Sequence, residues 1–418
     1  MKYIVMLVMI TAFLPGVGAN INLGIIYLSL LRISLCVLVG IYFLKYLKFK
    51  KLDYRIKKNN FLPILFLTIW FLYSLFSVCW AKNLPDWIHG EYFIGIGFLA
   101  VLFFDMANLK SENFFEILIG VQYALIIHNI IGWYEVFTHH YLFAPIERIS
   151  IMSKSNQYFP ISMFANQNDF MLILLLGMCV SFFFVCTCKK KILKIINLFF
   201  TLSNIILCIL TDSRVGIISA VLLLFVEICF LLPKKIRKIG IVVGAVFSLI
   251  ILAAFQYLLI SQADMIINNS FLTASANPIV DSDAVRVNLI KNGLFFLKET
   301  CGFGVGTGNA EYWIENYAVY YTRGFVNIHN WWIEILTNFG IIMFAGYICF
   351  YVYLLYSLYK RFKYSETTEK YFCIMLIGFL IAFIPASISS SSNWGKEWLW
   401  MWFAFIVAYV GTEVNSDV

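Results

Sequence analysis

The chain has 418 residues, of which 61% are hydrophobic and 13% are charged, against a charged fraction of about 25% in a typical soluble domain. This composition excludes a water-soluble globular protein. Apolar runs of about twenty residues, rich in aromatic side chains, recur along the sequence, and each is long enough to cross ~30 Å of hydrocarbon as a helix. The sequence therefore predicts an all-α polytopic integral membrane protein.

The formal net charge of +8 does not indicate nucleic-acid binding. Lys and Arg fall in short clusters between the apolar runs, a pattern that sets the orientation of a chain in a bilayer. Most of the ten cysteines lie within apolar runs, which supports neither a disulfide framework nor a metal site. We therefore expect no nucleic-acid partner, no metal and no cofactor.

In chain order, the apolar runs predict about twelve spans, near residues 3–18, 20–46, 61–80, 89–107, 114–137, 167–186, 192–210, 214–232, 239–260, 329–357, 371–388 and 397–414. The first run also has features of a signal peptide. We interpret it as an uncleaved helix, because so many further spans follow it.

The distribution of Lys and Arg predicts which loops face the cytoplasm. With the N-terminus inside, 21 of the 31 basic residues are cytoplasmic and nine are external, while Arg32 lies within a span. The predicted organisation is therefore 1–260 with nine spans, 261–328 as an external loop and 329–418 with three spans, both termini being cytoplasmic. Arg32 is compatible with a buried structural pair or with a lipid phosphate contact.

The external loop 261–328 is too long for a simple connection, and loops of this length are usually functional or disordered. Apolar and basic residues alternate over 285–298 in the pattern of an amphipathic helix that could lie on the membrane surface. Next comes a glycine run, 302–308, which does not follow a strand and so does not predict a dinucleotide site. We interpret this run as a flexible turn that returns the chain to the membrane.

Two external arginines are candidate site residues. A minimal turn at 211–214 places Arg214 at the start of a helix on the membrane surface, where headgroup snorkelling is an equally good interpretation. Arg286 belongs to the predicted external helix. No P-loop motif occurs in the sequence, so the predicted reaction uses an already activated substrate or an ion gradient.

The start of the tenth span carries a second polar group. His329 and Asn330 open this span, and Glu334 follows one turn deeper on the same helix face as Asn330. A satisfied intramembrane pair is the structural alternative for Glu334. We favour a functional role, because an unpaired carboxylate at that depth is costly.

Four motifs occur in order: Thr-x-Ser-Arg-x-Gly at 211–216, the helix-opening Arg286, Gly-x-Gly-x-Gly-Asn at 304–309, and His-Asn-x-x-x-Glu at 329–334 with Gly340 and Gly346 behind it. In this order and topology they resemble the O-antigen ligase and polymerase superfamily. The resemblance covers roughly 204–350. The first half resembles the family only in hydropathy.

The resemblance implies a GT-C-like, metal-independent glycosyltransferase of the bacterial cytoplasmic membrane, with its active site facing outside. Its donor would be an oligosaccharide on undecaprenyl diphosphate. Breaking a sugar–diphosphate bond develops negative charge on the leaving group, and the forked donors of arginine match phosphate oxygens. A neutral histidine can take the proton of an attacking hydroxyl.

Applied residue by residue, the resemblance predicts Arg214 and Arg286 as catalytic cations that bind the diphosphate, and His329 as the base. Glu334 would orient His329 or bind sugar. Further substrate contacts are predicted for Asn330, and for Tyr312 and Trp313 in the aromatic run, where interfacial anchoring is an equally good interpretation.

The predicted function is a polysaccharide polymerase for O-antigen, capsule or exopolysaccharide. One alternative is a ligase that moves the finished glycan to another acceptor. The alternative from another class is a secondary transporter or a lipid-linked saccharide flippase. Expected partners are membrane lipid, the lipid-linked oligosaccharide, and a flippase and a chain-length regulator.

Overall fold

The computed structural model describes residues 1–15, 21–22, 27–49, 56–233, 235–237, 282–390 and 393–412. Nine helices in these ranges are long and apolar enough to cross a membrane. They are α2 (Leu30–Phe49), α3 (Phe61–Phe76) with its 3₁₀ turns η1 (Lys58–Asn60) and η2 (Ser77–Cys79), α4 (Leu84–Met106), α5 (Ser111–Thr138), α7 (Gln167–Thr187), α8 (Lys191–Leu210), α9 (Arg214–Leu231), α13 (Trp331–Tyr364) and α14 (Thr367–Ala386). The predicted all-α polytopic fold is confirmed.

Two further apolar helices are shorter than predicted. Helix α1 (Lys2–Ala12) has 11 residues and α15 (Glu397–Val410) has 14. At 1.5 Å per residue they are about 16 and 21 Å long, less than the ~30 Å of a hydrocarbon core. With the nine longer helices they account for eleven predicted spans, and the predicted span at 239–260 lies outside the described residues.

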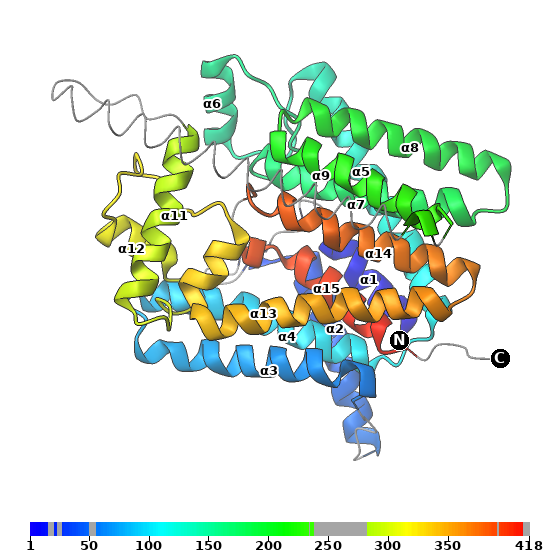
Figure 1. Cartoon of the computed structure of the whole chain (residues 1–418), viewed down its shortest axis with the longest axis horizontal. Coiled ribbons are helices and arrows are strands. Elements are labelled where there is room, and N and C mark those ends of the chain that lie inside the picture. The colour runs from blue at the N-terminus through cyan, green and yellow to red at the C-terminus, as the bar shows by residue number, and fades with distance from the viewer. Residues whose placement is uncertain are drawn as a thin grey trace.

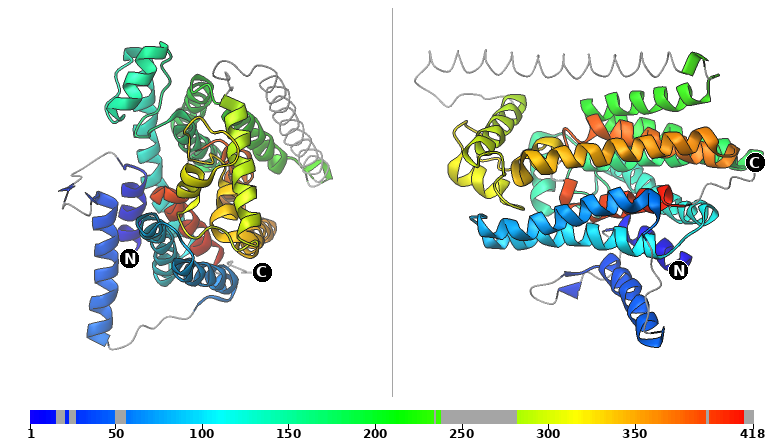
Figure 2. Two further views of the ribbon diagram at one scale, coloured as in Figure 1. Left: turned by 90° about the vertical axis from the view of Figure 1, so that its left-hand side faces the viewer. Right: turned by 60° about the horizontal axis from the view of Figure 1, so that its bottom comes forward.

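Helix α15 is the centre of the bundle (Figure 2, left, red). Every residue from Trp398 to Val410 is buried, as expected for a helix that is apolar on all sides. At its C-terminal end, Arg361 of α13 donates from Nη1 to the carbonyls of Tyr409 (3.2 Å) and Thr412 (2.8 Å). These bonds satisfy backbone carbonyls at the helix end that lack an intrahelical partner. They also fix the position of α15 along the bundle.

Helices α6 (Ile146–Ser155), α11 (Ser282–Glu299) and α12 (Ala310–Tyr317) gather at one end of the bundle, and the start of α1 lies at the other (Figure 1). We refer to the first as the α12 end. Between α1 and α2, a two-residue antiparallel pair joins β1 (Ile21–Asn22) to β2 (Tyr27–Leu28). The 3₁₀ turn η3 (Asn393–Gly395) precedes α15.

Helix α11 confirms the predicted helix over 285–298, but its apolar face packs against protein. Leu289 and Phe296 are buried with Val305, Ile314 and Ile328 in a small second core between α11, α12 and the start of α13. Leu294 is exposed. The membrane-surface interpretation is therefore wrong for the buried face, because the following chain folds back over it.

The glycine run is a tightly docked segment and not a flexible turn. Four glycines have positive φ: Gly302, Gly304, Gly306 and Gly308. Helix α13 is broken at Gly340 (φ 80°, ψ −179°), and the run bonds to the break: Val305 N donates to Thr337 O (2.9 Å), Gly306 N to Asn338 O (3.0 Å) and Ile341 N to Gly302 O (2.9 Å). A broken helix is tolerated in a membrane protein where such partners satisfy its backbone.

Replacing Gly340 by alanine is expected to destabilise the protein strongly. A Cβ there would lie 2.3 Å from the Gly302 carbonyl oxygen, and positive φ adds strain. Together these terms cost about 2–5 kcal/mol. The matched control is Gly324→Ala, which has the same φ of +80° but nothing within 4 Å of its Cβ. Thermal unfolding of both variants in detergent tests this, and equal losses would contradict the docked arrangement.

Candidate active site at the α12 end

Arg214 is the first residue of α9. The chain turns between α8 and α9 at residues 211–213, where Asp212 adopts a positive φ of 54°. The Ser213 hydroxyl accepts a hydrogen bond from Gly216 N (3.1 Å), which caps the helix. The predicted minimal turn is confirmed, and it leaves the Arg214 side chain exposed.

His329 lies just before α13, and its surroundings keep the imidazole neutral. It has a positive φ of 52°, and its backbone N–H donates to Asn327 Oδ1 (2.9 Å). Burial lowers the pKa of the imidazole to about 4, with Arg286 and Lys396 also lowering it and Asp169 raising it. His329 and Arg286 are therefore within electrostatic range of each other. A neutral imidazole at physiological pH can accept a proton.

An ion pair that sequence reasoning missed lies beside His329. Lys396 Nζ is 2.9 Å from Asp169 Oδ1, and the two side chains are 10% and 8% exposed. Asp169 is in the first turn of α7, where Asn166 Nδ2 also donates to its Oδ2 (3.0 Å). A sequence signal existed, because both residues are charged and lie at the ends of predicted spans.

Arg32 forms an ion pair, the first of the two predicted alternatives. It is in the first turn of α2, and its Nε and Nη2 both lie 3.3 Å from Glu397 Oε1. Tyr92 of α4 donates to the same oxygen (2.6 Å). The Arg32 guanidinium lies 4.8 Å from the centre of the Tyr92 ring. Three elements are therefore joined at the start of α15.

Glu334 is buried, and it is bonded to the turn before α15. Its Oε1 accepts a hydrogen bond from Trp394 Nε1 of η3 (2.5 Å). Trp394 O in turn accepts from Trp400 Nε1 (2.7 Å). The carboxylate thus holds the turn that leads to Lys396.

We expect Glu334→Leu and Trp394→Phe to have similar, modest effects on activity, because each removes one partner of the same hydrogen bond. If Glu334 acts only through this turn, the double variant should be no worse than either single variant. Rates of glycan formation by the three variants test this. Additive losses would indicate a separate role for Glu334, such as sugar binding.

The other predicted substrate contacts have structural partners. Asn330 Oδ1 accepts from Trp332 N (3.1 Å) and Ile333 N (3.2 Å), which makes Asn330 the N-cap of α13. Trp313 packs on Phe296, with ring centres 5.3 Å apart, and Lys82 Nζ lies 4.1 Å from its ring centre. Tyr312 lies on the same helix and is partly exposed. The Tyr312 ring packs on Tyr317, with ring centres 6.3 Å apart.

A pocket of about 400 Å³ lies between the end of α1 and the start of α15. It lies where α1 ends and where α2 and α15 begin, and Phe93 of α4 and residues 163–165 complete its lining. Its charged lining is Arg32, Lys396 and Glu397. The pocket is linked to the start of α13, because Trp394, next to the pocket-lining Gly395 and Lys396, donates to Glu334 in the first turn of that helix (2.5 Å).

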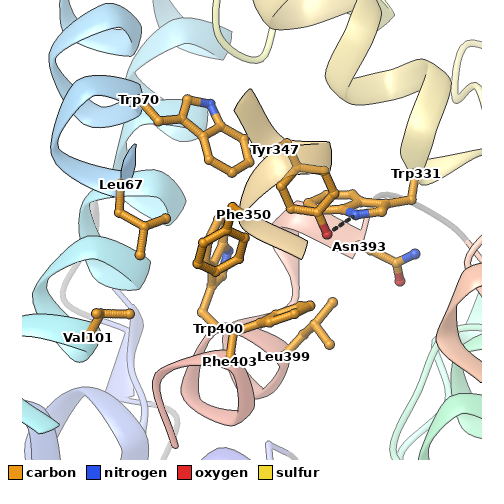
Figure 3. A pocket seen from close by; sticks show the side chains of 10 residues that line it. All are labelled: Leu67, Trp70, Val101, Trp331, Tyr347, Phe350, Asn393, Leu399, Trp400 and Phe403. Atoms are coloured by element: carbon orange, nitrogen blue, oxygen red, sulfur yellow. Dashed lines mark hydrogen bonds between the residues drawn. The ribbon is translucent and has the colours of Figure 1, made fainter. Parts of the chain in front are cut away.

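A second cavity, among Trp70, Tyr347, Trp400 and other side chains, is apolar and measures about 10 Å³ (Figure 3). It is just large enough for one water molecule. Its hydrogen bond, from Trp331 Nε1 to Tyr347 Oη (2.9 Å), joins two lining residues. We assign it to packing. In the described ranges, no three His, Cys, Asp or Glu side chains cluster in a way that could hold a metal ion.

Comparison with known proteins identifies the family to which this chain belongs. A family model described as O-antigen ligase matches residues 198–350. The teichuronic acid biosynthesis protein TuaE of Bacillus subtilis (strain 168) is 30% identical over 358 residues, which are 84% of this chain and 72% of that protein. The chain belongs to the O-antigen ligase and polymerase superfamily.

As a member of this superfamily, the chain is a multi-pass membrane protein. It is a glycan polymerase or ligase, and therefore an enzyme of the glycosyltransferase type. The matched region confirms the predicted resemblance over roughly 204–350 and contains Arg214, Arg286, His329 and Glu334. For the first half, where hydropathy was the only predicted resemblance, the match to the family model begins only at residue 198. The similarity to TuaE covers 84% of the chain and so extends into the first half.

Proposed function

We propose that the protein joins oligosaccharide units carried on undecaprenyl diphosphate into a longer polysaccharide, at the external face of the bacterial cytoplasmic membrane. The observation that carries this proposal is that a neutral His329 lies within electrostatic range of the cation Arg286. One supplies a base and the other stabilises a leaving anion, which are the two groups that glycosyl transfer from a diphosphate needs.

In the proposed step, an acceptor hydroxyl oxygen attacks the anomeric carbon of the donor sugar. The bond from that carbon to the diphosphate oxygen breaks, and the undecaprenyl diphosphate leaves with the electron pair. His329 takes the hydroxyl proton. Arg286 and Arg214 bind the departing diphosphate through forked N–H donors. The products are a glycosidic bond, a protonated histidine and free undecaprenyl diphosphate.

The alternative is a ligase, a reading favoured by the description of the matching family model as O-antigen ligase. A ligase and a polymerase use the same donor chemistry and differ only in the acceptor. Superfamily membership supports either enzyme over a transporter or a flippase. A flippase that delivers lipid-linked units and a chain-length regulator remain expected partners.

Purified protein supplied with lipid-linked repeat units tests the proposal. Longer glycan on the same lipid is expected. Glycan on a different added acceptor would establish the ligase instead, and no transfer to any acceptor would contradict both. Activity that disappears with EDTA and returns with a divalent cation would contradict the metal-independent mechanism.

The native thiol of Cys301 can test the proposed orientation, because it is exposed at the α12 end, just after α11. In a Cys79→Ser background, we expect an impermeant maleimide to label Cys301 in cells with an intact cytoplasmic membrane. Adding Cys301→Ser should abolish this labelling. Labelling of Cys301 only after lysis would place the α12 end in the cytoplasm and contradict the topology.

A further inference from the structure

We propose that the pocket between α1 and α15 binds the terminal sugar of the acceptor glycan. This inference rests on the proposed function and adds a second substrate site to it. The pocket measures about 400 Å³, within the range of ~300–1,000 Å³ that is usual for small-molecule sites.

Its position suits an acceptor. Trp394, next to the pocket-lining Gly395 and Lys396, donates to Glu334 in the first turn of α13 (2.5 Å), and His329 lies just before this helix. The charges of Arg286 and Lys396 both act on the imidazole of His329. A diphosphate bound by Arg286 and a sugar bound beside Lys396 would both be close to His329. A base between the two substrates can take a proton from an acceptor hydroxyl while the donor bond breaks.

Its charges suit an uncharged hydroxyl-rich group better than a diphosphate. Each pocket cation is matched by a carboxylate, Arg32 by Glu397 (3.3 Å) and Lys396 by Asp169 (2.9 Å). A diphosphate would have to compete with those carboxylates. A lipid tail would leave the ionic groups in contact with hydrocarbon, which is costly.

The pocket lining combines an oriented carboxylate, that of Glu397, with apolar side chains. Arg32 and Tyr92 hold Glu397 through one oxygen, Oε1, so the carboxylate is oriented before a ligand binds. Carboxylates accept hydrogen bonds from hydroxyls. Phe93 and Trp398 also line the pocket and offer apolar contacts to the C–H groups of a sugar ring.

The test measures binding of two probes to nanodisc-embedded full-length protein. One probe is the lipid-free oligosaccharide released by mild acid from the host's lipid-linked repeat units, and the other is undecaprenyl diphosphate without sugar. Glu397→Gln removes the oriented charge. Ala165→Trp adds bulk at an exposed residue that lines the pocket. Ala318→Trp, at an exposed residue after α12 and outside the pocket lining, is the matched control.

We expect Glu397→Gln and Ala165→Trp each to weaken oligosaccharide binding by about tenfold or more, with undecaprenyl diphosphate binding unchanged and the control equal to wild type. The proposal is wrong if the wild type does not bind the oligosaccharide, or if both pocket variants bind it normally. It is also wrong if these variants lose undecaprenyl diphosphate binding, because that would place the donor in the pocket. If the wild type forms no longer glycan, the proposed function fails, while the binding results still decide on the site.

Discussion

Replacing His329 by alanine is expected to lower glycan formation by ~10²–10⁴-fold, the usual loss for a general base, while the protein still inserts, purifies and binds the lipid-linked donor. The physical reason is that the imidazole is held neutral beside Arg286 and so can take the acceptor proton. The measurement is the initial rate of glycan formation, together with donor binding and thermal unfolding.

His140→Ala is the matched control, because His140 is an exposed histidine that follows α5; it should retain full activity. If His329→Ala is fully active, the histidine is not the base. Stabilisation of the leaving group by arginine would then be the main catalytic effect. If His329→Ala instead fails to fold, its role is structural.

The same residue predicts the pH dependence of the reaction. A base works in its deprotonated form, and the pKa of His329 is lowered to about 4. Activity should therefore persist as the pH falls through ~6.5, the usual pKa of histidine, and decline only near pH 4. Lys396→Met removes a charge that lowers this pKa, so the acid limb should move to higher pH. If the acid limb does not move in this variant, it reports the titration of a group other than His329.

Arg286→Lys is expected to reduce activity by about 10²–10³-fold, the range found when one oriented donor to a developing charge is lost. Lysine keeps the positive charge beside His329 but loses the planar fork that binds two phosphate oxygens. The acid limb of the pH profile should therefore stay in place while the rate falls. Arg214→Lys should be severely impaired for the same reason.

Lys298→Ala is the control for Arg286→Lys, because Lys298 is exposed in the last turn of the same helix and should not affect the rate. Near-normal activity of both lysine variants would show that charge alone suffices and would contradict bidentate diphosphate binding.

The sequence by itself determined the features that depend on local composition. Apolar runs of membrane-spanning length predicted the helices, since a chain segment can cross hydrocarbon only if its backbone N–H and C=O groups are hydrogen-bonded to each other. Ser213 and Asn330 are helix-capping residues at the starts of α9 and α13, so short-range signals sufficed to place Arg214 and His329. The motifs were specific enough to indicate the superfamily, because each one combines residues close together in the chain.

Only the tertiary structure decided which distant residues meet. Asp169 and Lys396 are 227 positions apart in the sequence, and Arg32 and Glu397 are separated by 365, so no local pattern could pair them. The docking of the glycine run onto the break at Gly340 likewise depends on two backbones approaching each other. The pocket has the same origin, because its lining comes from segments far apart in the chain: the end of α1, the starts of α2 and α15, Phe93 of α4 and residues 163–165.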